Sequence, residues 1–236
     1  SSLFTRELAE SYAILRQPAR VRRSALILLT SNRGLCGAFN SNLVRLARSV
    51  LSQRRGDGVE VEFHVIGKKG IGYFRFRGEP MASARRDITD RPNLEDARSV
   101  IDPLIARFES GELDAIDVVY AQFRTALSTP PACMRILPVE PRANATSSGS
   151  RNYLLEPSPD AILTLVLPLY VRNALYRALV ETAAAEQGAR RTAMKNATDN
   201  ADELTRTLTR DYNRARQSQI TQEISEIVGG AEALAG

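Results

Sequence analysis

The sequence predicts an α/β domain, built on a small, mostly parallel sheet with flanking helices, followed by one long C-terminal helix. Two observations carry this prediction. Apolar runs of strand length alternate with segments of helical periodicity in the first part of the 236 residues, and such alternation favours parallel strands joined by helices. From Leu169 to Val228 there is then no proline and a single glycine, Gly188. At 1.5 Å per residue, that segment predicts a helix of about 90 Å.

The first elements follow from apolar patterning and turn residues. Leu3–Leu15 has the spacing of a helix, and the continuous apolar run Ser24–Thr30 is typical of a buried parallel strand. After a glycine-bearing turn at Ser31–Gly37, apolar residues at helical spacing predict a helix over Phe39–Leu51. A second strand is expected at Val59–Ile66, where apolar and polar residues alternate.

The second half of the α/β part is patterned in the same way. A short basic helix is predicted at Lys68–Phe76, whereas Met81–Ile88 carries no clear signal. Asn93–Phe108 places its apolar residues on one helical face. Ala115–Phe123 and Met134–Val139 are rich in apolar and β-branched residues and predict two further strands.

The long helix has a clear start and a clear expected end. Ser158 is a suitable cap, Pro159 suits the first turn, and Gly229-Gly230 is expected to end the helix. The predicted organisation is the end of an N-terminal helix (1–17), an α/β domain (18–140), a flexible connection (141–157) and the long helix (158–236).

Two apolar stripes run along this helix. Their residues recur in steps of three and four, the spacing of a coiled-coil seam. The proximal stripe comprises Met194, Ala197, Ala201, Leu204, Leu208, Tyr212 and Ala215; after a slip of one residue, the distal stripe comprises Ile220, Ile224 and Ile227. A helix much longer than a domain cannot bury both stripes in its own core, so we expect other chain segments or other proteins to cover them.

Charge and cysteine usage exclude several classes of protein. The net charge of the chain is +5; residues 1–158 hold 23 basic and 17 acidic side chains (+6) and residues 159–236 hold 9 and 10 (−1), so the basic excess belongs to the first part. Gly67–Arg77 could bind nucleic acid phosphates, but a solvated or protein-facing helix is the favoured interpretation.

The apolar run Ala161–Val171 is too short to cross a bilayer. Cys36 and Cys133 form no metal motif and are expected to be free and mostly buried, although a disulfide between them stays open.

No catalytic or cofactor-binding set emerges. The loop Thr30–Gly37 joins a strand to a helix but lacks both common phosphate-binding motifs, which favours a tight turn over a nucleotide site. His64 is expected to be a hydrogen-bonded structural residue. Asp87, Asp90 and Asp96 have the pattern of surface charge. We therefore predict no catalytic residue, no cofactor and no metal.

Like charges repeat along one face of the long helix. Arg206, Arg210 and Arg214 recur every four residues, a spacing at which like charges destabilise an isolated helix. Asp202 and Asp211 offset part of that repulsion. Acidic groups on a partner that contacts this face would offset more.

Five segments resemble the gamma subunit of F-type ATP synthases. They are Ser31–Asn40, Gly67–Gly70, Met194–Ala201, Tyr212–Gln217 and Ile220–Ala231. The resemblance implies a central rotor stalk, in which the long helix forms half of an antiparallel coiled coil inside the alpha/beta head. It also implies an N-terminal partner helix, of which Leu3–Leu15 would be the end, so we expect a longer protein.

The resemblance also implies partners and contact residues. Expected partners are the alpha, beta and epsilon subunits and the c-ring, with no nucleic acid and with membrane contact only through the complex. Arg191, Arg216, Gln217, Thr221 and Glu223 match positions that meet the alpha/beta head, and Tyr153 and Glu156 match positions that meet the c-ring and epsilon. Thr192 and Leu155 depart from the family pattern, where methionine and an aromatic residue are more common.

The implied protein is a non-catalytic subunit of a rotary proton- or sodium-translocating ATP synthase. It would couple rotation of the c-ring to ATP synthesis or hydrolysis. The implied location is the cytoplasmic face of the bacterial inner membrane, as a peripheral protein. Two alternatives are a stand-alone nucleotide-binding α/β protein with a coiled-coil arm and a coiled-coil or nucleic-acid-binding adaptor. Neither explains the dense matches on the long helix.

Overall fold

The computed structural model describes residues 12–88, 90–125, 128–139 and 159–235. The chain divides into two compact units, Ser1–Arg191 and Thr192–Gly236. The first unit holds the sheet, and the second is helical throughout its described residues. The long helix α5 (Pro159–Ala235) supplies elements of both units.

The first unit is built on a five-stranded sheet. Its strands lie in the order β3-β2-β1-β4-β5, and all neighbouring pairs are parallel except β4 and β5, which are antiparallel. The bounds are β1 (Arg23–Leu29), β2 (Glu60–Ile66), β3 (Ser83–Arg85), β4 (Ala115–Ala121) and β5 (Pro131–Leu137). The predicted small, mostly parallel sheet is confirmed.

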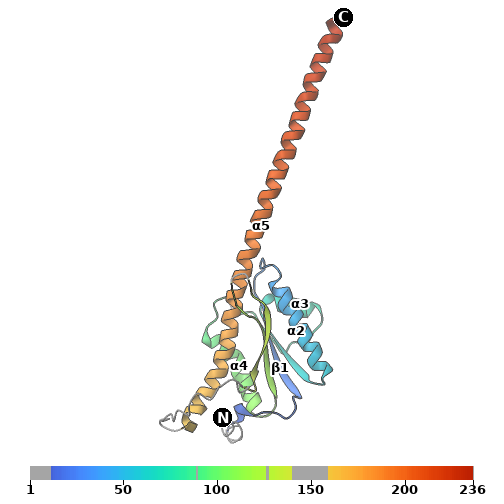
Figure 1. Ribbon diagram of the computed structural model, residues 1–236. Helices are drawn as coiled ribbons and strands as arrows, with labels where there is room; N and C mark the ends of the chain where they lie inside the picture. The colour runs from blue at the N-terminus through green and yellow to red at the C-terminus, as the bar shows by residue number, and fades with distance from the viewer. Residues whose placement is uncertain (1–11, 89, 126–127, 140–158, 236) are drawn as a thin grey trace, which may run out of the picture. The chain divides into compact units, whose positions relative to one another are not determined.

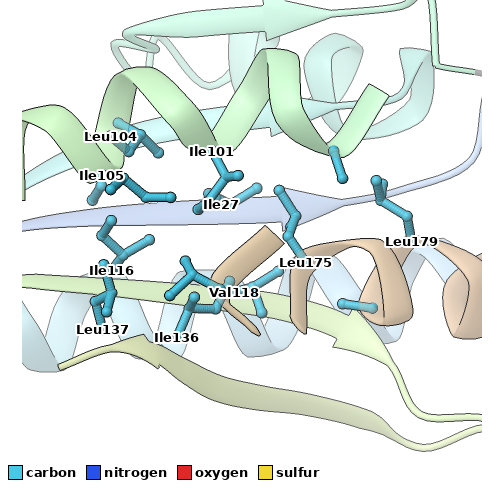
Figure 2. Close-up of a cluster of buried hydrophobic side chains, with 14 of the residues drawn as sticks. Ile27, Ile101, Leu104, Ile105, Ile116, Val118, Ile136, Leu137, Leu175 and Leu179 are labelled. Atoms are coloured by element: carbon cyan, nitrogen blue, oxygen red, sulfur yellow. The ribbon is translucent and has the colours of Figure 1, made fainter. Parts of the chain in front are cut away.

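Helices cover both faces of the sheet (Figure 1). Helices α2 (Phe39–Gly56) and α3 (Lys68–Phe76) lie on one face; α4 (Leu94–Glu109) and the first part of α5 lie on the other. Because successive residues of a strand point to opposite faces of the sheet, β1 contributes side chains to two hydrophobic cores, one on each face. Ile27 packs with α4 and α5 (Figure 2), whereas Leu26 and Leu28 pack with α2 and α3.

The start of α4 shows how local sequence fixes an element. Asn93 is the N-cap rather than the first helical residue: its side chain accepts from the Asp96 N–H at 2.8 Å, and Asp96 accepts from the Asn93 N–H at 2.9 Å. This reciprocal pair is a capping box, which satisfies donors that the helix leaves free.

Three expectations about elements were wrong or incomplete. Strand β3 lies within Met81–Ile88, where the sequence predicted no element. Only three of its residues pair with β2, which is too few to give a periodic pattern. Of the helix expected at Leu3–Leu15, only the end is described, and Ala13–Leu15 is a 3-10 helix. Gly229-Gly230 does not end α5, which continues to Ala235 because glycine weakens a helix without breaking it. The expected cap Ser158 and connection 141–157 lie outside the described residues.

The first part of α5 is a core helix of the first unit. Val171, Leu175 and Ala178 are fully buried, and Arg172 pairs with Asp102 of α4 at 2.7 Å. By length and composition alone, α5 also contains a window apolar enough to cross a membrane, with mean hydropathy 1.2, which the sequence analysis did not anticipate. Only 22% of that window is buried: Val171, Leu175 and Ala178 pack on the sheet, whereas Leu165 stays 74% and Tyr170 53% exposed.

Candidate functional site

The second unit exposes both apolar stripes. In the proximal stripe Leu204 and Leu208 are each 59% exposed and Tyr212 67%; in the distal stripe Ile227 reaches 72%. Large side chains at regular helical spacing are seldom left in water, because each gains roughly 1.5–3 kcal/mol when fully buried. The prediction that this unit does not bury the stripes by itself is confirmed.

The two stripes point in different directions around the helix. Ile220 follows Ala215 by five residues instead of three or four. At about 100° per residue, this step turns the distal stripe by about 130° relative to the proximal one. A single straight helix packed against the proximal stripe would therefore leave the distal stripe uncovered.

Polar residues predicted to contact partners flank the distal stripe. Arg216 and Glu223 are seven residues apart and lie along one side of it, whereas Gln217 and Thr221 lie along the other. All four are exposed, and within residues 159–235 neither Arg216 nor Glu223 has an ion-pair partner. The Thr221 hydroxyl donates to the Gln217 carbonyl at 2.9 Å. The arrangement is an apolar strip with a polar border, typical of protein interfaces.

The remaining predicted contact residues lie elsewhere. Arg191 is the last residue of the first unit and is exposed. Tyr153 and Glu156 lie outside the described residues.

The arginine column lies on the side of the helix away from the proximal stripe. Arg206, Arg210 and Arg214 are all exposed and are centred about 150° from that stripe. Arg210 has one weak pair, with Asp211 at 3.7 Å. Asp202 forms no ion pair in the described part of the helix. The acidic side chains on the helix therefore offset only part of the repulsion between the three arginines.

In the first unit, the turn after β1 meets the start of α3. The first N–H groups of α3 are all occupied: Lys68 donates to Asn32 Oδ1 at 3.0 Å, Lys69 to the Ser31 carbonyl at 3.1 Å, and Gly70 to Thr30 Oγ1 at 3.0 Å. Phosphate binding at a helix start needs free N–H groups. The start of α3 therefore has no free N–H group for a phosphate, while the start of α2, which follows the loop Thr30–Gly37, is a separate helix end.

Gly67 allows this close approach. Its φ is +101°, and an added Cβ would lie 2.0 Å from the Thr30 carbonyl oxygen. Only glycine fits both constraints. The motif Gly67–Gly70 therefore has a structural role in the turn.

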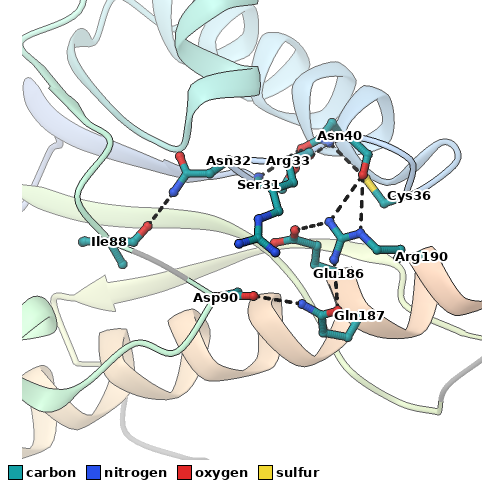
Figure 3. A network of polar contacts seen from close by, with 11 residues as sticks. Ser31, Asn32, Arg33, Cys36, Asn40, Ile88, Asp90, Glu186, Gln187 and Arg190 are labelled. Carbon is teal, nitrogen blue, oxygen red and sulfur yellow. Dashed lines mark hydrogen bonds and ion pairs between the residues drawn. The ribbon is translucent and has the colours of Figure 1, made fainter.

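Arg190 of α5 holds the loop at the end of β1 (Figure 3). Its guanidinium donates to the Gly34 carbonyl at 3.4 Å and to Glu186 at 2.5 Å. Inside the loop, Asn40 Nδ2 donates to Ser31 Oγ at 2.8 Å. Neither Arg190 nor the exposed Leu35 stood out from the sequence, because the contact joins residues far apart in the chain and a loop conformation has no periodic signal.

The two cysteines differ from each other. Both are free, but only Cys36 is buried, whereas Cys133 is exposed. The expectation that both would be mostly buried was wrong for Cys133, because it lies on the edge strand β5. Although Cys133 as a residue is exposed, neighbouring atoms partly desolvate its thiol, and this desolvation, followed by the charge of Asp117, raises the pKa of Cys133 to about 11.

The titratable residues of the first unit form structural contacts. His64 Nδ1 lies 2.8 Å from Ser83 Oγ, as expected for a structural histidine, and burial lowers the pKa of His64. Asp87 pairs with Arg85 at 2.5 Å. Asp117, buried on β4, accepts from Arg54 at 3.0 Å and from Arg135 at 2.9 Å, a cluster that the sequence analysis missed. Among the described residues, no group of side chains could hold a metal.

Charge separates the two helical faces of the first unit. Helix α2 carries four arginines and α3 carries three basic residues, and neither holds an acidic side chain. Helix α4 carries four acidic and two basic residues. The basic excess read from the sequence is thus concentrated on the α2 and α3 face.

Comparison with known proteins places the chain in a family. A family model described as ATP synthase matches residues 1–234. The ATP synthase gamma chain of Gemmatimonas aurantiaca is 55% identical over 237 residues, which cover 100% of this chain and 82% of that protein. The ATP synthase gamma chain of Frankia casuarinae is 44% identical over 220 residues, which cover 90% of this chain and 74% of that protein.

Solved structures share the fold. The chain aligns with the central stalk and c-ring structure of Tetrahymena thermophila mitochondrial ATP synthase with a TM-score of 0.60 and 24% identity, over 81% of this chain and 85% of that chain. For a Euglena gracilis mitochondrial ATP synthase structure of OSCP, F1 and c-ring, the TM-score is 0.62 at 21% identity, over 97% and 75% of the two chains. Together with the family match, these findings show that the chain belongs to the ATP synthase gamma-chain family, and that it is the central rotor-stalk subunit, which couples ion-driven rotation to ATP synthesis or hydrolysis.

Proposed function

We propose that the second unit is the shaft that the alpha and beta subunits grip, and that the first unit meets the epsilon subunit and the c-ring. The observation that carries the proposal is the pair of uncovered apolar stripes. Leu204, Leu208 and Tyr212 stay more than half exposed in the chain by itself. A helix can transmit torque only if other chains bind it, and burial of these apolar side chains against those chains provides the binding free energy.

The rotation between the stripes supports two separate contacts. The proximal stripe has the spacing for one antiparallel partner helix. The distal stripe turns away by about 130°, so a different surface must cover Ile220, Ile224 and Ile227. We assign that surface to the alpha/beta head.

The polar residues beside the distal stripe suit this assignment. Arg216, Gln217, Thr221 and Glu223 border the three isoleucines, and Arg216 and Glu223 are free to pair with charges on another chain. In the proximal region, the column of Arg206, Arg210 and Arg214 favours acidic groups on whatever surface it meets. Arg191, exposed at the end of the first unit, is assigned to the same head.

The contact with the membrane sector rests on the resemblance. Tyr153 and Glu156 match the family positions that meet the c-ring and epsilon. In this proposal the chain is a peripheral membrane protein on the cytoplasmic face of the bacterial inner membrane, and it touches the membrane only through the complex.

Substitutions beside the distal stripe test the proposal. Arg216→Ala and Gln217→Ala in the assembled enzyme should lower ATP-driven proton pumping more than ATP turnover, by about fivefold for the loss of roughly 1 kcal/mol of contact. Ser218→Ala is the matched control, because Ser218 lies on the opposite side of the helix from the distal stripe. Unchanged pumping and turnover in both variants, with normal assembly, would remove these residues from the contact surface.

A further inference from the structure

Two neighbouring cavities form one groove between helices α2 and α3, which lie side by side on the same face of the sheet (Figure 1). The larger cavity has a volume of about 600 Å³ and the smaller one about 390 Å³. Arg45, Arg48 and Tyr73 line both cavities. The larger volume lies within the range of small-molecule sites, so the charges of the walls decide which ligand the groove suits.

Cations line the groove from both helices. On α2, Arg45, Arg48 and Arg55 lie within about 80° of one another around the helix axis. On the other wall, Lys69 lies in the first turn of α3 and Arg77 directly follows its end. These two residues are eight positions apart and therefore lie on the same side of α3. Five positive side chains thus line one groove.

The fold leaves most of this positive charge without a counter-charge. Neither α2 nor α3 contains an acidic residue. Glu79 is the one carboxylate that lines the groove among the described residues, and it is paired with Arg55. Arg45 and Arg77 have no ion-pair partner in the part of the chain that the structure describes. Because neighbouring cations repel one another, an anion bound in the groove would remove a repulsion that the fold itself does not remove.

Two of the cations are already held in place. Arg48 Nη1 donates to the Tyr73 hydroxyl at 3.3 Å, and Arg55 Nη1 donates to Glu79 Oε2 at 3.3 Å. These contacts limit the directions in which the two guanidinium groups can point, which lowers the entropy cost of binding. The Tyr73 hydroxyl accepts from Arg48 and still has its own hydrogen to donate. The groove therefore presents a partly ordered set of donors to an anion.

We propose that the groove between α2 and α3 binds an anion that carries a chain of phosphate groups, either inorganic triphosphate or the triphosphate of a nucleotide. Guanidinium groups bind phosphate oxygens through paired hydrogen bonds. A chain of phosphates can contact several of them at once, whereas a single phosphate would meet only part of the charge. The site differs from the nucleotide site considered at Thr30–Gly37, because its donors are side chains rather than backbone N–H groups. It lies wholly in the first unit and does not depend on the proposed contacts of the shaft.

Isothermal titration calorimetry of the full chain with sodium triphosphate at low salt tests the proposal. The wild-type chain should bind the anion, and Arg45→Gln and Arg77→Gln should each weaken binding by about tenfold, because each removes a charged donor. Both variants should unfold at the wild-type temperature, since neither side chain has an ion-pair partner in the described residues. Arg75→Gln is the matched control: it removes the same charge from α3, but Arg75 lies two residues from Tyr73 and Arg77 and so on the other side of the helix. Its affinity should change by less than about twofold.

A second titration, with ATP in the absence of magnesium, distinguishes the two sources of the phosphate chain. Tighter binding of ATP than of triphosphate assigns the site to nucleotides, and equal or weaker binding assigns it to the phosphate chain alone. If the wild-type chain binds neither anion, or if all three variants lose affinity equally, the proposal is wrong, because at most general charge attraction would then act. Tighter binding of a glutamate-rich peptide than of triphosphate would also overturn it, in favour of an acidic protein segment.

Discussion

Gly67→Ala should strongly destabilise the first unit. The added Cβ would lie 2.0 Å from the Thr30 carbonyl oxygen and 2.6 Å from Thr30 Oγ1, and φ at +101° would be strained. Relief requires the backbone to move, which disrupts the bonds from Thr30 Oγ1 to the Ile66 carbonyl (2.9 Å) and from the Gly70 N–H to Thr30 Oγ1 (3.0 Å). Two lost bonds at about 1 kcal/mol each and about 2 kcal/mol of backbone strain give a loss of about 4 kcal/mol.

Denaturant unfolding followed by tyrosine fluorescence measures this loss. Since small domains have about 5–15 kcal/mol of stability, the midpoint should fall by a large part of its value. Gly72→Ala is the matched control, because it lies in the same helix α3 with nothing within 4 Å of an added Cβ. That variant should gain about 0.5–1 kcal/mol. A loss below about 1 kcal/mol in Gly67→Ala would refute the reasoning.

Two further predictions concern titratable groups. Burial lowers the pKa of His64 below its ordinary 6.5, so that, as the pH falls, His64 is protonated in the unfolded state before it is protonated in the folded state. The stability that His64 contributes is therefore complete above about pH 6.5 and declines as the pH falls towards the folded pKa. Unfolding midpoints between pH 5 and 8 should therefore decline less steeply in His64→Gln, and parallel profiles would contradict this. For Cys133, with its pKa raised to about 11, alkylation followed by mass spectrometry should accelerate roughly tenfold per pH unit until near that value. Asp117→Asn should accelerate it at neutral pH by removing a negative charge, and a plateau near pH 9 would count against the raised pKa.

Elements with strong local signals could be predicted from the sequence. The apolar run at Ser24–Thr30 became β1, and α3 begins and ends where its pattern indicated. Both signals depend on residues close together in the chain. The alternation of strands and helices was sufficient for the mostly parallel sheet.

Features set by distant contacts could not be predicted. Strand β3 exists because Ser83–Arg85 pair with β2, and three residues are too few for a periodic pattern. The contact between Arg190 and Gly34 joins residues 156 positions apart, and the positive φ of Leu35 follows from it and its neighbours. The stripes of α5 could be recognised in the sequence because they form a regular apolar spacing, and no described segment of the chain covers them.

Hydrogen exchange of Met194–Ile227, in the free chain and in the assembly with the alpha and beta subunits, tests the central claim most directly. If other chains cover the stripes, these amides should exchange rapidly in the free monomer and at least about a hundredfold more slowly in the assembly. In the assembly, local opening of the helix must also expose the apolar side chains that the other subunits bury, which raises its free energy. Amides of β1, buried in the first unit in either state, should not change. Strong protection of Met194–Ile227 in the free monomer, with no further gain on assembly, would contradict the claim.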